Sequence, residues 1–119
     1  MNIEELREYC LSIPGASECL PFDDMSLVLK VLDKMFALIP LDNLAATTIS
    51  VKCDPEKAIE LREHYSSVEP AYHFNKKYWN TITLNGDMDD ENVQKWVQHS
   101  VQEVIKKLPK KIQQEYYGK

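Results

Sequence analysis

The segment at residues 47–53, TTISVKC, most constrains what this chain can fold into. Its apolar side chains Ile49, Val51 and Cys53 alternate strictly with polar ones. A period of two places successive side chains on opposite faces of an extended strand. One apolar and one polar face are typical of an antiparallel sheet that packs on a core from one side only. The segment therefore predicts such a sheet.

Two apolar runs before this segment predict further strands. Residues 25–32 (MSLVLKVL) and 35–39 (MFALI) are separated by Asp33-Lys34. A two-residue gap between such runs is typical of a β-hairpin. After it, residues 68–73 and 79–84 have the composition of two more strands. The sequence therefore predicts about five strands, with residues 16–24 as a loop.

Helical patterns separate and follow these strands. Starts are indicated by the capping pair Asn2 and Glu5 and by Asp54-Pro55, and Pro109 ends the longest pattern. The expected helices are residues 3–13, 55–65 and 89–107 and a short one after Pro109. In the second, Ala58, Leu61 and Tyr65 are expected to face inward. The third has a buried stripe of Val93, Trp96, Val97, Val101, Val104, Ile105 and Leu108.

The order of these elements, α-βββ-α-ββ-αα, predicts the fold class. It indicates an α+β domain with an antiparallel sheet and helices mostly on one face. With 119 residues, 44% of them hydrophobic and 28% charged, the chain has the size and composition of one globular domain. We therefore expect residues 1–119 to form a single domain.

Charge is distributed unevenly along the chain. The net charge is −5, with 12 acidic and 6 basic residues before residue 64 and 7 acidic and 8 basic from there on. An acidic protein repels nucleic acid overall, so any such binding needs a local basic patch. Four lysines near the C-terminus are expected at solvated helix ends, with a phosphate-facing role as the alternative: Lys106, Lys107, Lys110 and Lys111.

Several classes of protein are disfavoured by what the chain lacks. Its longest apolar run, residues 35–40, is too short to cross a bilayer, and acidic residues replace the basic start of a signal peptide. Three cysteines, Cys10, Cys19 and Cys53, form no C-x-x-C pair and are expected to be reduced thiols. These features predict a cytoplasmic protein without a membrane segment.

Patterns for metals, cofactors and catalysis are also missing. His64, His73 and His99 lack metal-ligand spacing, and the three glycines are not clustered into a phosphate loop. The acidic run at residues 87–91 lacks the spacing of a calcium loop and is expected to cap a helix. We therefore expect no metal, no cofactor and no enzymatic activity. A Cys–His dyad assembled in three dimensions is the alternative that the sequence leaves open.

Residues 72–80, YHFNKKYWN, combine four aromatic side chains with two lysines, two asparagines and a histidine. One interpretation is a β-hairpin in which aromatic rings pack and Asn75 adopts a positive φ in the turn. The other is a binding loop, because hydrogen-bond donors and cations backed by rings suit phosphate oxygens or an exposed base.

The same stretch resembles a known family. The pattern HxNKKxWNT, together with KVLDKMFAL, VKCDPEKAIELRE and His99-Ser100, is similar to the MmcQ/YjbR family of small bacterial proteins. The resemblance implies a frataxin-like or secretion-chaperone-like α+β fold and a proposed double-wing DNA-binding role. The chain departs from the family pattern at Leu32-Asp33, where relatives tend to have Gly-Gly, and at Ala71, where glycine is common.

These observations lead to a first hypothesis, low-affinity and non-enzymatic DNA binding through phosphate contacts. Lys76 and Lys77 would neutralise phosphates, and Trp79 would support them by packing or stacking. The hydrogen-bond donors would be His73, Asn75 and Asn80. The alternative is a protein-interaction or chaperone-like module that binds a partner on its sheet, as a monomer or homodimer.

Overall fold

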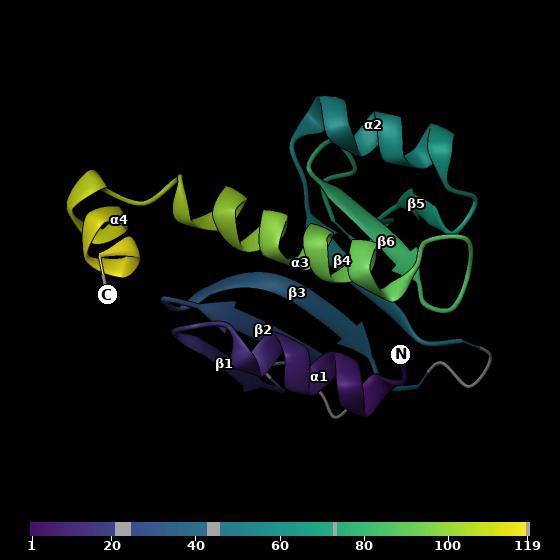
Figure 1. The fold of residues 1–119 in the computed structure, drawn as a ribbon, viewed down its shortest axis with the longest axis horizontal. Helices are drawn as coiled ribbons and strands as arrows, with labels where there is room; N and C mark the ends of the chain where they lie inside the picture. The colour runs from purple at the N-terminus through teal and green to yellow at the C-terminus, as the bar shows by residue number, and fades with distance from the viewer. Residues whose placement is uncertain (21–24, 43–45, 73, 119) are drawn as a thin grey trace.

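A computed structural model describes residues 1–20, 25–42, 46–72 and 74–118 of the chain. Its strands form one antiparallel sheet in the order β1-β2-β3-β4-β6-β5 (Figure 1). The strands are Ala16–Cys19 (β1), Ser26–Val31 (β2), Lys34–Pro40 (β3), Thr48–Lys52 (β4), Val68–Pro70 (β5) and Trp79–Thr83 (β6). The helices are Ile3–Ser12 (α1), Pro55–His64 (α2), Asp90–Ile105 (α3) and Lys110–Tyr117 (α4). The predicted α+β class is confirmed.

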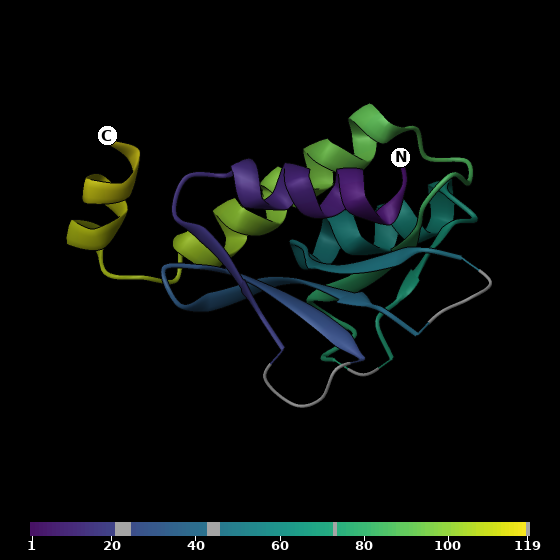
Figure 2. The same ribbon diagram turned by 90° about the horizontal axis from the view of Figure 1, so that it is seen from below.

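Helices α1, α2 and α3 cover one face of the sheet, and among the described residues no helix covers the other face (Figure 2). The covered face and these helices share one hydrophobic core, in which Phe36, Ile49 and Ile82 of the sheet are fully buried. Most of the stripe predicted for α3 is buried there too, whereas Trp96 is only partly buried. The predicted placement of the helices on one face is confirmed.

The sheet has one strand more than the sequence predicted. Strand β1 lies in the segment expected to be a loop and pairs with β2, with Ala16 opposite Val31 and Cys19 opposite Val28. Its sequence, ASEC, shows no apolar alternation because it is an edge strand with partly exposed side chains. The hydrogen bonds to β2 form the strand, and an ion pair between Arg7 and Glu18 links it to α1.

The hairpin between β2 and β3 forms as predicted, but its turn lies one residue earlier. Val31 pairs with Lys34, so the turn residues are Leu32 and Asp33 rather than Asp33 and Lys34. Their φ angles are 51° and 66°. Positive φ at both positions is the type I′ geometry that matches strand twist and is usually formed by glycine or asparagine. Because the first turn position holds an apolar leucine, the sequence pattern placed the turn one residue too late.

Helix α4 extends beyond the end of α3, away from the sheet (Figure 1). None of its residues is fully buried. The hydroxyl of Tyr116 donates a hydrogen bond of 2.6 Å to the carbonyl of Pro14, which attaches α4 to the turn after α1. Across the described residues, no helix has the length and apolar content needed to span a membrane.

Candidate nucleic-acid interface

The loop between β5 and β6 carries the two lysines of the predicted site. Strand β5 ends at Pro70, three residues earlier than expected, so the loop starts sooner. The N–H of Tyr78 donates to the carbonyl of Asn75 at 3.0 Å, and the N–H of Lys77 donates to the Asn75 side-chain oxygen at 3.0 Å. Asn75 is not among the residues with positive φ, which corrects that expectation. Its side chain shapes the turn instead. We call residues 74–78 the lysine loop.

The ammonium groups of the lysine loop are exposed and lie against aromatic rings. Lys76 Nζ is 4.9 Å from the ring centroid of Tyr72, and Lys77 Nζ is 5.6 Å from that of Tyr78. Such cation–π contacts orient a lysine without neutralising its charge. Neither lysine forms an ion pair with any carboxylate in the described ranges. Both charges therefore remain available to an anion.

Aromatic packing supports the loop from below. The rings of Phe74 and Trp79 stack with centroids 4.9 Å apart and an interplanar angle of 22°. Trp79 is the first residue of β6 and is partly buried, so the stack connects the loop to the sheet. The geometry is suited to the supporting role predicted for Trp79.

Arg62 of α2 fixes the base of the loop. Its Nε donates to the side-chain oxygen of Asn80 at 2.6 Å, and its Nη2 donates to the carbonyl of Lys76. The sequence analysis did not single out this arginine. The signal was available, because Arg62 lies in the VKCDPEKAIELRE stretch that carries the family resemblance.

One of the predicted donors, Asn80, is not part of the exposed site. Asn80 is only 1% exposed, and its amide group is occupied, accepting from Arg62 and donating to the carbonyl of Ala58 at 3.2 Å. Its role here is structural, so we leave it out of the binding surface. His73 lies outside the described residues.

A second group of lysines lies at the same end of the sheet. A cavity of about 380 Å³ is lined by Lys34, Lys52 and Lys107, with Met35, Val104 and Leu108 as its apolar part. Lys52 is paired with Trp79, which places this lysine cavity beside the lysine loop. None of the three lysines forms an ion pair within the part of the chain that the structure describes.

Ser100 of α3 holds the end of β4 in this position. Its hydroxyl accepts from the N–H of Lys52 at 2.9 Å and donates to the carbonyl of Phe36 at 2.6 Å. The neighbouring His99 accepts from the N–H of Asp54 at 3.2 Å through Nε2. Burial lowers the pKa of His99, which favours the neutral ring that this bond requires. The His99-Ser100 pair thus supports the strand that carries Lys52.

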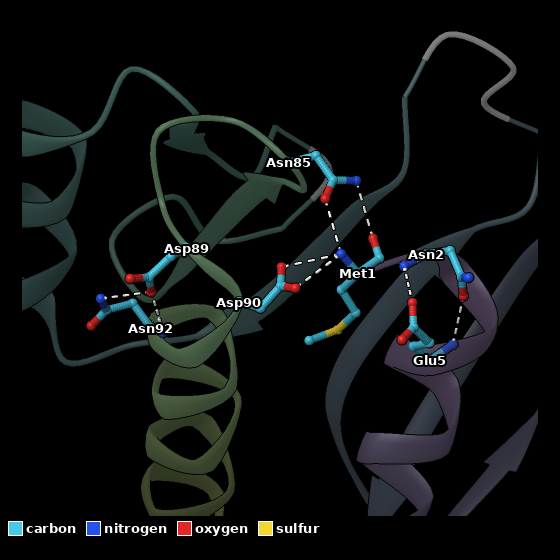
Figure 3. Close-up of polar contacts among 7 residues, drawn as sticks. All are labelled: Met1, Asn2, Glu5, Asn85, Asp89, Asp90 and Asn92. Atoms are coloured by element: carbon cyan, nitrogen blue, oxygen red, sulfur yellow. Dashed lines mark hydrogen bonds and ion pairs between the residues drawn. The ribbon is translucent and has the colours of Figure 1, made fainter.

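Within the acidic run at residues 87–91, Asp89 is the N-cap of α3 (Figure 3). The side chain of Asp89 accepts from the N–H of Asn92 at 2.8 Å. Asp90 lies 3.0 Å from the amino group of Met1, which also donates to the side chain of Asn85 at 2.9 Å. The expected helix cap is confirmed. The described residues contain no group of three or more potential metal ligands.

The two buried cysteines, Cys10 and Cys53, are not activated thiols. Burial raises the pKa of both Cys10 and Cys53 to about 12, which disfavours the thiolate that nucleophilic chemistry needs. No hydrogen bond links a cysteine to a histidine among residues 1–20, 25–42, 46–72 and 74–118. The structure therefore offers no support for the Cys–His alternative in these ranges.

Comparison with known proteins agrees with this architecture. The model of the YjbR family matches residues 11–102. The chain belongs to the YjbR family. It is 36% identical over 110 residues to the YjbR protein of Escherichia coli K12, covering 92% of each chain. It is 26% identical to the YbdF protein of Escherichia coli O157:H7, again over 110 residues, 92% of this chain and 89% of that protein.

Solved structures match this YjbR-family fold closely. A crystal structure of a Deinococcus radiodurans protein has a TM-score of 0.86 at 37% identity, covering 98% of this chain and 88% of that one. A crystal structure of a Pseudomonas syringae protein has a TM-score of 0.71 at 25% identity, covering 84% and 96% respectively. The family match includes the lysine loop, Arg62 and Lys52 but ends before Lys107. Fold does not imply function, so function is argued from the site itself.

Proposed function

We propose that this YjbR-family protein binds DNA with low affinity through phosphate contacts at the lysine loop. The observation that supports it most is the exposure of Lys76 and Lys77, whose ammonium groups rest on rings and pair with no described carboxylate. Lysines in this state release counterions from DNA when they neutralise phosphates. The proposed role is cytoplasmic and requires no chemistry on the ligand.

The surrounding surface can extend the contact. The lysine cavity lies beside the loop, so Lys34, Lys52 and Lys107 add positive charge at the same end of the sheet. Two to four phosphate contacts give a slope of roughly −2 to −4 in a plot of log affinity against log salt, with affinity no tighter than about micromolar. A net charge of −5 opposes anything tighter.

The test removes the two charges at exposed positions, where the substitutions should leave the fold unchanged. In Lys76→Ala/Lys77→Ala, we expect duplex affinity to fall roughly tenfold and the salt slope to become shallower by about 2. Fluorescence anisotropy of a labelled duplex, titrated from low to moderate salt, measures both quantities.

A matched control removes two other lysines. Lys57 of α2 and Lys95 of α3 are also exposed and lie at a cavity between those helices. Lys57→Ala/Lys95→Ala changes the net charge equally, so a general electrostatic effect would weaken binding in both variants. If the lysine-loop variant keeps the affinity and the slope of the unmodified protein, the proposal is wrong.

A second candidate function is a protein-interaction module. Leu20, Met25 and Leu41 are 42–47% exposed, and they flank the ends of β1, β2 and β3 at the end of the sheet opposite the β2–β3 turn. Exposed apolar side chains grouped together favour a protein partner. Such binding would depend weakly on salt. Capture of a partner from extract that survives nuclease treatment separates this candidate from one bridged by nucleic acid.

A further inference from the structure

A cavity of about 490 Å³ lies on the sheet face that carries no helix, and phosphate binding alone does not use it. Its volume is in the range of small-ligand pockets, 300–1,000 Å³. The loop after β5 contributes Tyr72 and Phe74 to its lining, and the sheet contributes Thr48, Ser50, Thr81 and Glu69. The cavity is therefore lined by both aromatic rings and hydroxyl groups.

The hydroxyl groups come from the polar positions of the alternating strands. Ser50 and Thr81 are paired across β4 and β6, with their side-chain oxygens 2.8 Å apart. One hydroxyl donates to the other, so the second O–H still has a proton to donate. Neither oxygen has another hydrogen-bond partner among the described residues. The pair therefore presents both a donor and free lone pairs to the cavity.

The cavity adjoins the lysine loop through one shared side chain. Tyr72 lines the cavity and is 63% exposed, and its ring also carries the ammonium group of Lys76 at 4.9 Å. A positive charge is therefore located at one side of the cavity. Glu69 is the only charged residue in the described lining, and its carboxylate repels an anion from the interior. A ligand with a phosphate at the lysines and a neutral planar part inside fits this distribution.

We propose that this cavity takes one unpaired base of a nucleotide whose phosphate is held by Lys76 and Lys77. The proposal rests on the proposed function and names its ligand more narrowly. Aromatic side chains bind bases by stacking, and hydroxyl groups bond to base edges of any sequence. The same chemistry occurs in single-stranded nucleic acid and in a free mononucleotide.

A base in a duplex does not fit this description. It is stacked on its neighbours and paired on its Watson–Crick edge, and taking it out of the stack costs free energy. Phosphate contacts alone give the reverse preference, because counterion release is larger for duplex than for single strands. The order of the two affinities therefore distinguishes base binding from phosphate binding.

The experiment compares a single strand and a duplex of equal length by anisotropy at matched salt. We expect the single strand to bind at least about fivefold more tightly. In Tyr72→Ala, single-strand affinity should fall about tenfold, the usual loss when a stacking ring is removed. Duplex affinity should fall several-fold less, because the duplex loses only the cation–π contact that orients Lys76. Tyr72 is largely exposed, so its removal leaves the core intact.

Tyr117→Ala serves as the matched control. Tyr117 is 57% exposed on α4 and does not line the cavity, so its removal should leave both affinities unchanged.

A third titration with a mononucleotide identifies the source of the ligand. Equal affinity for mononucleotide and oligonucleotide indicates a free nucleotide, whereas tighter oligonucleotide binding indicates a single strand. Either result supports the shared chemistry.

Other outcomes overturn the proposal. If the duplex binds as tightly as the single strand, or if Tyr72→Ala weakens both equally or neither, no base occupies the cavity. Phosphate binding at the lysine loop survives that result as long as Lys76→Ala/Lys77→Ala still weakens both ligands. If the double-lysine variant binds both ligands normally, the proposed function itself fails, and the base-binding proposal with it.

Discussion

The acidic run that starts α3 and the lysine loop are both dense charged clusters, but the protein uses them differently. At the acidic run, Asp89 accepts a backbone N–H and Asp90 pairs with the amino terminus (Figure 3). Asp87 accepts from the N–H groups of Ser66 and Ser67. At the lysine loop, the ammonium groups of Lys76 and Lys77 lie against aromatic rings and pair with no described carboxylate.

This difference separates stabilising charges from binding charges. A carboxylate that accepts backbone N–H groups is stabilised in its ionised form and contributes to folding. An exposed lysine without an ion pair contributes little to folding and remains free to attract an external anion. A charged cluster in a sequence therefore indicates binding only when the fold leaves its charges without internal partners.

The largest effect on stability is expected at the base of the lysine loop, where a buried, hydrogen-bonded amide lies next to lysines without ion pairs. Asn80→Ala removes a buried amide that bonds to Arg62 and Ala58. Because both partners lose their bond, we expect the free energy of unfolding to fall by about 2–3 kcal/mol. Urea denaturation measures it.

Asn75→Ala is the control for that prediction. Asn75 is exposed and its side chain bonds only within the turn, so we expect a loss below about 0.5 kcal/mol. If Asn80→Ala is as mild as this control, the amide is not structural, and its predicted role as a ligand donor returns.

An intermediate, pH-dependent effect is expected at Asp87. The nearby Ser67 hydroxyl and the N–H groups of Ser66 and Ser67 favour its ionised form and lower its pKa from 3.8 to about 2. Ser67 Oγ is buried without a hydrogen bond of normal geometry, so the N–H donors at 2.7 and 2.9 Å are the firmer cause.

A carboxylate whose pKa is lower in the folded than in the unfolded state stabilises the fold fully at pH values above the unfolded-state pKa. This contribution is lost as pH falls toward the folded-state pKa. The unmodified protein should therefore have a larger free energy of unfolding than Asp87→Asn, and this difference should shrink as pH falls from about 3.8 toward about 2. Urea titrations at several pH values measure it. The control is Gln102→Ala on α3, an exposed position whose side chain does not ionise, so its difference from the unmodified protein should not vary with pH. A flat curve for Asp87→Asn would show that its charge is not used in folding.

The smallest effect on stability is expected from the loop lysines. Lys76→Ala/Lys77→Ala should change the free energy of unfolding by no more than about 0.5 kcal/mol, because exposed side chains without ion pairs contribute little. Thermal and urea unfolding measure it on the same protein preparations used for DNA binding. A large loss of stability would mean that these charges are also engaged internally, and the contrast between the two clusters would disappear.

Most of the fold follows from local patterns, and its exceptions have local causes. The alternation at residues 47–53 and the apolar stripe of α3 predict β4 and the helix that packs on it. Strand β1 was missed because its edge position places no apolar requirement on ASEC. The β2–β3 turn was displaced because Leu32 adopts a φ that its residue type rarely takes.

The site was predicted only in part. The lysines, Asn75 and Trp79 were proposed because a cluster of cations and rings is visible in the sequence, and their binding role stays a prediction. Arg62 and Lys52 were not singled out. Arg62 joins the site through hydrogen bonds from α2, and Lys52 joins it through the pairing of β4 with β6. The cavity beside Tyr72 also depends on several strands, which no single segment reveals.

The sequence by itself determined most of the extended and helical segments, and which of their faces are apolar. Those properties depend on the spacing of neighbouring residues, since a strand repeats every two residues and a helix every 3.6. Only the tertiary structure decided which polar groups are occupied. The partners of Asn80 and Ser100 lie 18 to 64 residues away, so a buried amide and an exposed lysine look alike until the chain has folded.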